Sequence, residues 1–346
     1  MTQPSISVVV PTFNRKSSLY RLLAAIERQT YPAASFEVVI VDDGSTDGTR
    51  ELLRGLRLPF ELRLIEQAHA GPAAARNLGV ANARAELIVF LDDDVVPIPT
   101  LLEEHAATHR LAADLVVVGP MSPPQDWQRP AWVRWEEDTL QVQYRDMLAG
   151  KYPCTPRQFY TANVSLRRAC FVESGGFDVA FKRAEDVELA FRLRDRGARF
   201  LFNPNAEVMH YASRSFSAWA KTPYQYGRYD IVMARDKDQE TLQLATYEFH
   251  RRNALTRLAV RACVGRGWLL RCAIGLMRML VTLADRSGAP RHVTGPILSG
   301  IFNVLYWQGA CDELGGRAAM MLAIEEGARM AHKPPVIVSE APALEF

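Results

Sequence analysis

The sequence lacks several features that mark whole classes of protein. It holds five cysteines in 346 residues, an odd number with no C-x-x-C pair: Cys154, Cys170, Cys263, Cys272 and Cys311. This pattern argues against a disulfide framework and a zinc site, and it indicates reduced thiols in a cytoplasmic protein. The net charge is only +2, which argues against general nucleic-acid binding.

Signals for export and for membrane crossing are also missing. Strand-like sequence begins at about Ser5 with no charged leader before it, so we expect no secretory signal peptide. No uncharged run is long enough to span a bilayer. Apolar residues make up 48% of the chain and charged residues 23%, an ordinary globular composition. The length predicts one large domain with an appendage, or two domains.

Glycine is absent from the loop after the first expected strand. Residues 5–10 read as a buried strand, and Pro11-Thr12-Phe13-Asn14-Arg15 follows it. A Rossmann dehydrogenase needs a G-x-G-x-x-G motif at this point. A sugar nucleotidyltransferase needs a glycine-rich, basic loop there to hold a triphosphate. The absence of glycine therefore counts against both classes.

The chain does have acidic residues at the ends of apolar runs. Asp42-Asp43 follows the run 38–41, Asp92-Asp93-Asp94 follows the run 87–91, and Glu185-Asp186 forms a third cluster. Short apolar runs predict buried strands, and open α/β sheets place their ligands at the carboxyl ends of strands. Like charges crowded there repel one another, and a hard divalent cation such as Mg²⁺ or Mn²⁺ would relieve that repulsion.

The order of the expected elements predicts an α/β fold with a mostly parallel sheet flanked by helices. Strand signals occur near residues 5–10, 36–41, 61–65, 87–91, 114–118 and 198–202, and helical spacing occurs at 17–28, 46–56, 72–84, 98–111, 166–174 and 184–196. Residues 120–160 are rich in Pro, Trp and Gln, and we expect long loops or short elements there. Residues 213–330 are expected to be helical, and the Pro-rich tail from Lys333 to be loose.

Five motifs in a fixed order carry a family resemblance. They are Val10-Pro11-Thr12-Phe13-Asn14, Val41-Asp42-Asp43-Gly44-Ser45, Gly71-Pro72-Ala73-Ala74-Ala75-Arg76-Asn77, Asp92-Asp93-Asp94, and Gly175-Gly176-Phe177-Asp178 with Glu185-Asp186. Through them residues 1–210 resemble family-2 glycosyltransferases of the GT-A fold. The resemblance implies a GT-A catalytic domain over residues 1–212, with a nucleotide-sugar half to about residue 119 and an acceptor half from 120. A helical C-terminal region, 213–332, and a loose tail, 333–346, complete the expected organisation.

The resemblance also implies the chemistry. It implies an inverting glycosyltransferase that moves a sugar from a nucleotide-diphosphate-sugar, with a UDP-sugar favoured, to a hydroxyl of a glycan or lipid-linked acceptor in cell-surface glycan synthesis. Mn²⁺ or Mg²⁺ would bridge the pyrophosphate oxygens, and Asp186 corresponds to the catalytic base. The nucleotide-sugar residues are Pro11, Thr12, Asn14, Asp43, Arg76, Asp92 and Asp93, the metal ligands are Asp94 and His210, and Glu185 and Asn163 lie on the acceptor side.

Several of these acidic and polar residues also fit a structural role. Asp42 and Asp47 fit a turn and a helix cap. Strand alternation predicts that Asp93 points away from its two neighbours. Arg15 fits phosphate binding or a cap of the first loop, and Asn163 fits a turn as well as the acceptor side.

Other residues are predicted to be structural or have two interpretations of equal weight. Glu188 and Arg192, four apart on one helix, fit a surface pair or a role in the site. His105 and His109 have a spacing that can hold a metal, but no carboxylate motif frames them, and we expect a solvated helix face. Sugar stacking and packing onto the sheet are equally expected for four aromatic residues: Trp127, Trp132, Trp135 and Tyr144.

The helical region contains one basic amphipathic segment, residues 257–286. On a helical wheel its leucines face away from one arc of arginines: Arg257, Arg261, Arg271, Arg278 and Arg286. Arg266 falls off the arc between two glycines, which predicts two helices with a break. Such a segment either lies peripherally on the inner face of a membrane or packs on the catalytic domain with its arginines in water.

A non-catalytic binding or scaffold protein on the same fold is the alternative from a different class. Loss of the acidic positions would favour it. All four positions are intact, at Asp43, Asp92, Asp94 and Asp186.

Overall fold

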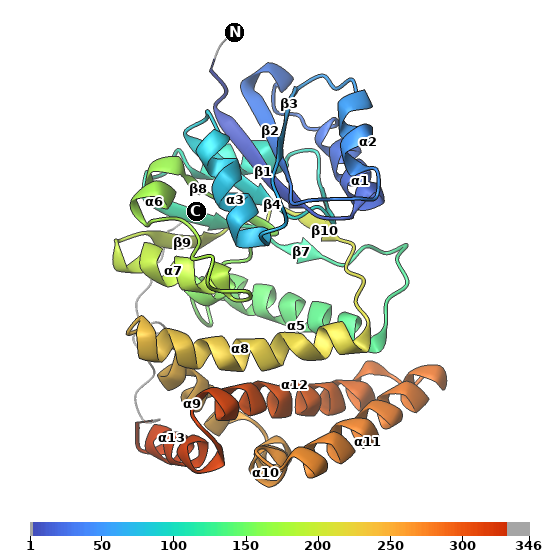
Figure 1. The fold of residues 1–346 in the computed structure, drawn as a ribbon, viewed down its shortest axis with the longest axis vertical. Helices are drawn as coiled ribbons and strands as arrows, with labels where there is room; N and C mark the ends of the chain where they lie inside the picture. Colours follow the sequence, from blue (N-terminus) through green and yellow to red (C-terminus); the bar gives the residue numbers. More distant parts are fainter. Residues whose placement is uncertain (1–2, 331–346) are drawn as a thin grey trace. The chain divides into compact units, whose positions relative to one another are not determined.

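Short apolar runs form a seven-stranded sheet in the computed structural model, which describes residues 3–330 (Figure 1). The strands are β1 Ile6–Thr12, β2 Phe36–Asp42, β3 Glu61–Glu66, β4 Leu87–Leu91, β6 Leu115–Val118, β8 Asn163–Arg167 and β9 Arg199–Phe202. Their order is β3-β2-β1-β4-β8-β6-β9. All pairs are parallel except those of β8 with β4 and β6, so the predicted mostly parallel sheet is confirmed.

Helices cover both faces of the sheet, as predicted. They are α1 Lys16–Ile26, α2 Thr49–Gly55, α3 Pro72–Asn82, α4 Leu101–Thr108, α6 Arg168–Glu173 and α7 Glu185–Asp195, with short 3₁₀ turns at η1 Ala33–Ser35 and η2 Pro156–Gln158. One apolar core joins Leu22 of α1 and Leu101 of α4 to the sheet. A second core joins Ala75 of α3 and Leu189 of α7 to the sheet. Strands covered in this way have no face left for water, which explains why β2 and β4 are buried along their whole length.

The register brings the ends of three strands together. Thr12 at the end of β1 lies opposite Asp42 at the end of β2. On the other side of β1, Val9 lies opposite Phe90 of β4. The acidic residues that follow β2 and β4 therefore flank Thr12 at the carboxyl edge of the sheet, where α/β folds bind ligands.

Helix α3 lies unusually close to this edge because it carries Gly79. A β-carbon at position 79 would lie 2.4 Å from Cγ1 of Val9, which is closer than any real contact. Only glycine allows such an approach of helix to strand. This close approach fixes the distance of α3 from β1. It thereby also fixes the position of Arg76, which lies one turn earlier on α3.

A small second sheet has the strand order β5-β10-β7. Its strands are β5 Val95–Pro97, β7 Met121–Ser122 and β10 Val208–His210. Strand β10 runs antiparallel to β5, and His210 pairs with Val95. This pairing places His210 beside Asp94, which precedes β5.

Residues 120–160 differ from the prediction of loops, because they contain the helix α5, Ala131–Leu148. Its aromatic side chains pack within the protein. The ring of Trp135 lies 6.0 Å from that of Trp219, and the ring of Tyr144 stacks on Phe202 at 5.1 Å. Trp132 and Trp135 therefore lie on the packed face of a helix, whereas Trp127 lies before it and contacts the ring of Tyr211.

The chain divides into two compact units. The first contains residues up to Trp127 and Leu140–Ala212, and the second contains Gln128–Thr139 and the residues from Ser213 on. The second unit is helical, as predicted, with α8 Phe216–Asp236, α9 Thr241–Arg251, α10 Ala254–Cys263, α11 Gly267–Arg286, α12 Arg291–Glu313 and α13 Arg317–Met330. The predicted break near Arg266 is present between α10 and α11. The tail 333–346 lies outside the described residues.

Candidate active site

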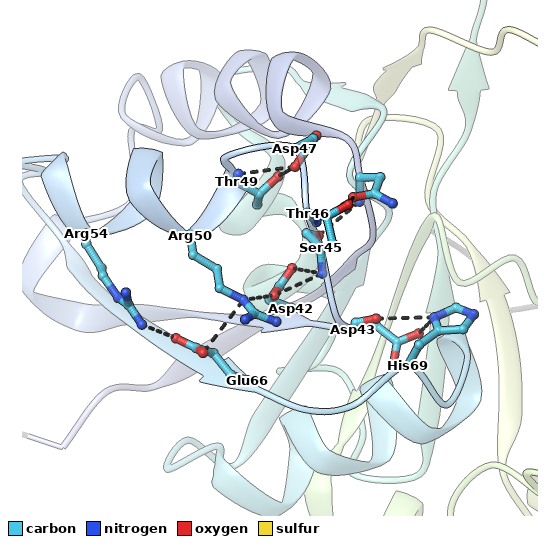
Figure 2. A network of polar contacts seen from close by, with 11 residues as sticks. Asp42, Asp43, Ser45, Thr46, Asp47, Thr49, Arg50, Arg54, Glu66 and His69 are labelled. Carbon is cyan, nitrogen blue, oxygen red and sulfur yellow. Dashed lines mark hydrogen bonds and ion pairs between the residues drawn. The ribbon is translucent and has the colours of Figure 1, made fainter.

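The loop after β2 is built around the carboxylate of Asp43 (Figure 2). Its Oδ1 accepts hydrogen bonds from the backbone N–H of Ala70 at 2.8 Å and from Gln67 at 2.6 Å, and its Oδ2 accepts from the N–H of Gly71 at 2.9 Å. His69 lies 2.8 Å from the same Oδ2. Burial raises the pKa of Asp43, but these donors have the larger combined effect and hold it below its usual range. Asp43 is thus an ionised group that fixes the loop before α3.

The neighbours of Asp43 have structural roles, as their turn and cap alternatives predicted. Asp42 accepts from the N–H of Ser45 at 3.2 Å and pairs with Arg50 at 2.5 Å. Asp47 accepts from the N–H of Thr49, the first residue of α2, at 3.1 Å. Figure 2 shows the side chains of Asp42 and Asp43 in separate parts of the network.

The end of β1 contributes Pro11 and Thr12, and the loop after it contributes Asn14. The hydroxyl of Thr12 donates to Oδ2 of Asp93 at 2.7 Å. Pro11 is the penultimate residue of β1, paired with Val41. Asn14 has φ +53°, and its Oδ1 accepts from the N–H of Thr46 at 2.7 Å, so it ties this loop to the loop after β2.

Asp93 is buried between Thr12 and the sheet. Burial raises its pKa to about 7, the charges of Asp92 and Asp94 add to the rise, and Arg15 and the bond from Thr12 oppose it. Asp92 contacts Arg76 instead, whereas Arg15 is shared: it lies 3.8 Å from Oδ1 of Asp93 and 2.6 Å from Oδ2 of Asp94. The middle aspartate therefore supports the loop after β1.

Arg76 connects two of the predicted acidic clusters. It is 4% exposed, and its guanidinium donates to Oδ1 of Asp92 at 2.6 Å and to Oε1 of Glu185 at 3.2 Å. Its Nε is buried with no partner among the described residues. This arginine, held by α3, fixes the end of β4 relative to the start of α7.

Asp94 lies between Arg15 and His210. Nη1 of Arg15 donates to its Oδ2 at 2.6 Å, and Nε2 of His210 lies 3.5 Å from its Oδ1. Burial raises the pKa of Asp94, but the bond and charge of His210, with Arg15, hold it well below its usual range. It is therefore ionised at neutral pH, as a metal ligand must be.

The donor set around Asp94 fits a divalent cation that also binds substrate. Within residues 3–330 no three His, Cys, Asp or Glu side chains form a ready metal cage. Mg²⁺ typically binds through one or two carboxylates together with substrate phosphates. Asp94 supplies one such carboxylate, and Nε2 of His210, a second candidate ligand, lies 3.5 Å from its Oδ1.

Asp186 is the second residue of α7. It is partly buried, and its Oδ1 accepts a hydrogen bond from the N–H of Val187 at 2.8 Å. Burial raises its pKa to about 7, and the neighbouring charge of Glu185 adds to the rise, whereas Val187 and Arg76 oppose it. A carboxylate with a pKa near neutrality is well matched to general-base catalysis.

The pair formed by Glu188 and Arg192 has a role inside the fold. Glu188 is fully buried, and its carboxylate binds Arg192 at 2.5 Å. The same guanidinium donates to the carbonyls of Ser174 and of Gly176, the latter at 2.7 Å. The pair therefore links α7 to the Gly175-Gly176 turn and is more than a surface ion pair.

Two sets of predicted residues lie away from this edge. Asn163 is fully buried and bonds to His105 and to the carbonyls of Pro120 and Ala206, so the structure gives it no surface that faces an acceptor. The prediction of a solvated face for His105 and His109 is wrong. Both are buried against β8, where Ser165 lies 2.8 Å from Nδ1 of His105 and from Nε2 of His109. Burial lowers their pKa values to about 4 and about 3, so both are neutral.

Sequence reasoning missed an aromatic pair at the mouth of the site. The rings of Phe13 and His69 stack with their centroids 4.2 Å apart, and Phe13 is 41% exposed. Phe13 lies inside the motif of residues 10–14, but the sequence alone does not show that its side chain is exposed. No sequence motif indicated a role for His69, because its position depends on its contact with Asp43.

Comparison with known proteins agrees with this geometry. Residues 7–171 match the model of glycosyl transferase family 2, and this segment carries the likeness of the chain to that family. The fold is therefore of the GT-A class that glycosyltransferases of this family share.

Individual relatives are named as glycosyltransferases. The chain is 34% identical over 220 residues to validoxylamine A glucosyltransferase of Streptomyces hygroscopicus, covering 56% of this chain and 52% of that protein. It is 28% identical over 232 residues to glycosyltransferase AglE of Haloferax volcanii, covering 66% and 74%. The chain thus spans about half the length of the first of these relatives.

A solved structure extends the likeness beyond the family segment. It is that of S. aureus TarS 1–349 in complex with UDP-GlcNAc, with a TM-score of 0.57 and 18% identity, covering 90% of this chain and 92% of that one. At this identity the likeness establishes the shared fold. The predicted GT-A fold is confirmed.

Proposed function

We propose that this protein is an inverting, metal-dependent glycosyltransferase that takes a sugar from a UDP-sugar. The observation that carries the proposal is the set of contacts joining Asp92, Arg76 and Glu185, with Asp94 and Asp186 beside them. At one end of this set, Asp94 would bind a cation that holds the diphosphate. At the other end, Asp186 would accept the proton of the acceptor hydroxyl. The UDP-GlcNAc bound to S. aureus TarS supports the choice of a uridine nucleotide.

Each residue has a role in this proposal. Thr12, Asn14 and Asp43, with Pro11, shape the pocket for base and ribose, and Asp92 meets the ribose. Asp94 and His210 would hold Mn²⁺ or Mg²⁺, which neutralises charge on a departing diphosphate. Asp186 takes the proton from the acceptor hydroxyl as its oxygen attacks the anomeric carbon. Attack from the face opposite the leaving group inverts the anomeric configuration.

Thermal unfolding with ligands tests the proposed donor. We expect UDP with Mn²⁺ to raise the midpoint of unfolding clearly more than either ligand alone, because the diphosphate completes the coordination of the cation. At a ligand concentration about 100 times the Kd the stabilisation is about 2.7 kcal/mol. ADP with Mn²⁺ is the control for base selection. No shift with any nucleotide diphosphate and Mn²⁺ would refute the proposed donor.

The charge of Glu185 should affect the pH at which Asp186 changes from its protonated to its ionised form. Since Glu185 raises the pKa of Asp186, Glu185→Gln should lower that pKa. The acidic limb of kcat against pH, expected near pH 7 in the natural enzyme, should then move to lower pH. Glu86→Gln, an exposed residue outside the site, should leave the limb in place. An unmoved limb in Glu185→Gln would mean that another group titrates.

The acceptor is proposed to be a glycan or lipid-linked carrier in cell-surface glycan synthesis. The names of relatives indicate varied acceptors, among them validoxylamine A and poly(ribitol-phosphate). We place the protein in the cytoplasm, peripherally at the inner face of the membrane, because a lipid-linked acceptor is held there. Screening donor hydrolysis across a panel of UDP-sugars would identify the sugar.

A further inference from the structure

The helices α10 and α11 expose an unusual amount of apolar surface. Sixteen large apolar side chains are exposed among the described residues, and seven of them lie on these two helices, each 42–75% exposed: Leu255, Leu258, Trp268, Leu276, Met279, Leu280 and Leu283. We call these side chains, with the arginines between residues 251 and 286, the α10–α11 surface. A contiguous exposed apolar patch marks an interaction site more often than chance.

Packing of α11 leaves this apolar strip uncovered. Ala273, Met277 and Val281 face the interior of the second unit, and α11 runs alongside α12 (Figure 1). Leu276 and Leu283 point elsewhere, since they are more than half exposed. Only 6% of the most apolar stretch of α11 is buried, which sets it apart from the core helix of a globular unit.

The same surface carries a strong positive charge. Residues 251–286 contain one acidic residue, Asp285, and eight arginines: Arg251, Arg252, Arg257, Arg261, Arg266, Arg271, Arg278 and Arg286. Asp285 is paired with Arg134. In the part of the chain that the structure describes, Arg252 alone among the eight has a carboxylate partner, Glu248 at 3.5 Å. Arg261 and Arg278 lie over the rings of Phe249 and Phe216. Such contacts do not neutralise a guanidinium, so its positive charge stays available to an external anion.

We propose that the α10–α11 surface binds an anionic lipid surface, with α11 lying in the plane of the interface. The apolar strip would enter the boundary between headgroups and acyl chains, and the arginines would bind lipid phosphates. Trp268, at the start of α11, has the amphipathic ring that prefers headgroup level. The inference deepens the proposed function, because it supplies the place where a lipid-linked acceptor would be met.

Two other arrangements fit the surface less well. A second copy of the chain would bring two sets of arginines together across a two-fold axis, and like charges oppose that contact. A spanning helix has the required length and composition in α11. It would have to place Arg271 and Arg278 in hydrocarbon and remove Val281, which is 3% exposed, from its packing.

Co-sedimentation with vesicles tests the proposal. We expect the full chain to bind phosphatidylcholine vesicles that contain phosphatidylglycerol at low salt, and to bind pure phosphatidylcholine far less. Binding should fall as salt rises, because the Debye length shortens from about 30 Å at 0.01 M to about 3 Å at 1 M. Arg271→Gln with Arg278→Gln should lower the partition coefficient by roughly 25-fold, about fivefold for each charge.

Matched variants separate charge from apolar burial. Leu276→Gln with Leu280→Gln should also weaken binding, and because both side chains are exposed the fold should be unchanged. Arg57→Gln with Arg110→Gln, which removes two exposed charges elsewhere, should bind as the natural protein does. Thermal shift with UDP and Mn²⁺ is measured on the same samples, so failure of the nucleotide site is distinguished from failure of membrane binding.

Three results would overturn the proposal. The first is no binding at low salt, and the second is equal binding to neutral vesicles. The third is a dimer in light scattering that Leu276→Gln with Leu280→Gln converts to a monomer, which would make this surface a protein interface. Resistance of the bound protein to extraction by high salt would instead indicate a spanning helix.

Discussion

Replacing Asp186 with asparagine should lower kcat by roughly 10²–10⁴-fold, the range that general-base catalysis contributes. The amide keeps the size of the side chain but cannot take a proton. The carboxylate it replaces has a pKa near 7, raised by burial and by Glu185, so it can accept a proton at neutral pH. Steady-state kinetics with donor and acceptor, together with the Kd for UDP, provide the measurement. The Kd for UDP should change little, because the proposed role of Asp186 is to take a proton from the acceptor and not to bind the nucleotide.

Asp195→Asn is the matched control for this variant. Asp195 is the last residue of the same helix, α7, and its exposed carboxylate contacts only its neighbour Arg194 among the bonds described here. It should keep natural kcat. If Asp186→Asn also kept near-natural kcat on its acceptor, the base would be another residue, and Glu185 would be the first to examine.

Removing the divalent cation should abolish turnover, and Mn²⁺ or Mg²⁺ should restore it. Asp94→Ala should behave like permanent chelation, with a loss of roughly a hundredfold or more, because a metal ion supplies several kcal/mol of charge stabilisation and about 1.4 kcal/mol equals a factor of ten. Titration of Mn²⁺ against activity, after treatment with a chelator, measures both effects. Full turnover in excess chelator would exclude the metal role of Asp94 and His210.

A control for Asp94→Ala lies at the opposite edge of the same sheet. Asp114 precedes β6 and pairs with Arg199 at 2.7 Å, with both side chains partly exposed. Exposed pairs of this kind contribute only about 0–1 kcal/mol to stability. Asp114→Ala should therefore lose little stability and need no more Mn²⁺ than the natural enzyme.

The sequence predicted those parts of the structure that depend on local pattern. Apolar runs ending in acidic residues defined β2 and β4 and placed Asp43 and Asp92 at one edge, since parallel strands share a carboxyl edge. Helix α5 was missed because its high content of Trp and Gln masked an apolar face. Only the structure identifies that face, because it shows the ring of Trp135 packed against the ring of Trp219.

Features set by distant pairing could not be derived in this way. Sequence motifs suggested His210 as a metal ligand, but its approach to Asp94 depends on β10 pairing with β5. The burial of His105 and His109 depends on which side of α4 meets β8. A spacing of four residues puts two side chains on one helix face, but it does not say whether water or a sheet covers that face.

The contact between Gly79 and Val9 links the position of Arg76 to the packing of the core beneath α3. The side chain of Val9 occupies the space where a β-carbon of residue 79 would lie, so the position of α3 and of Arg76 depends on glycine at this point. Any larger residue at position 79 would act as a spacer and move the whole helix, Arg76 included, away from Asp92 and Glu185. A change in core packing at this contact would therefore also change the position of Arg76 relative to Asp92 and Glu185.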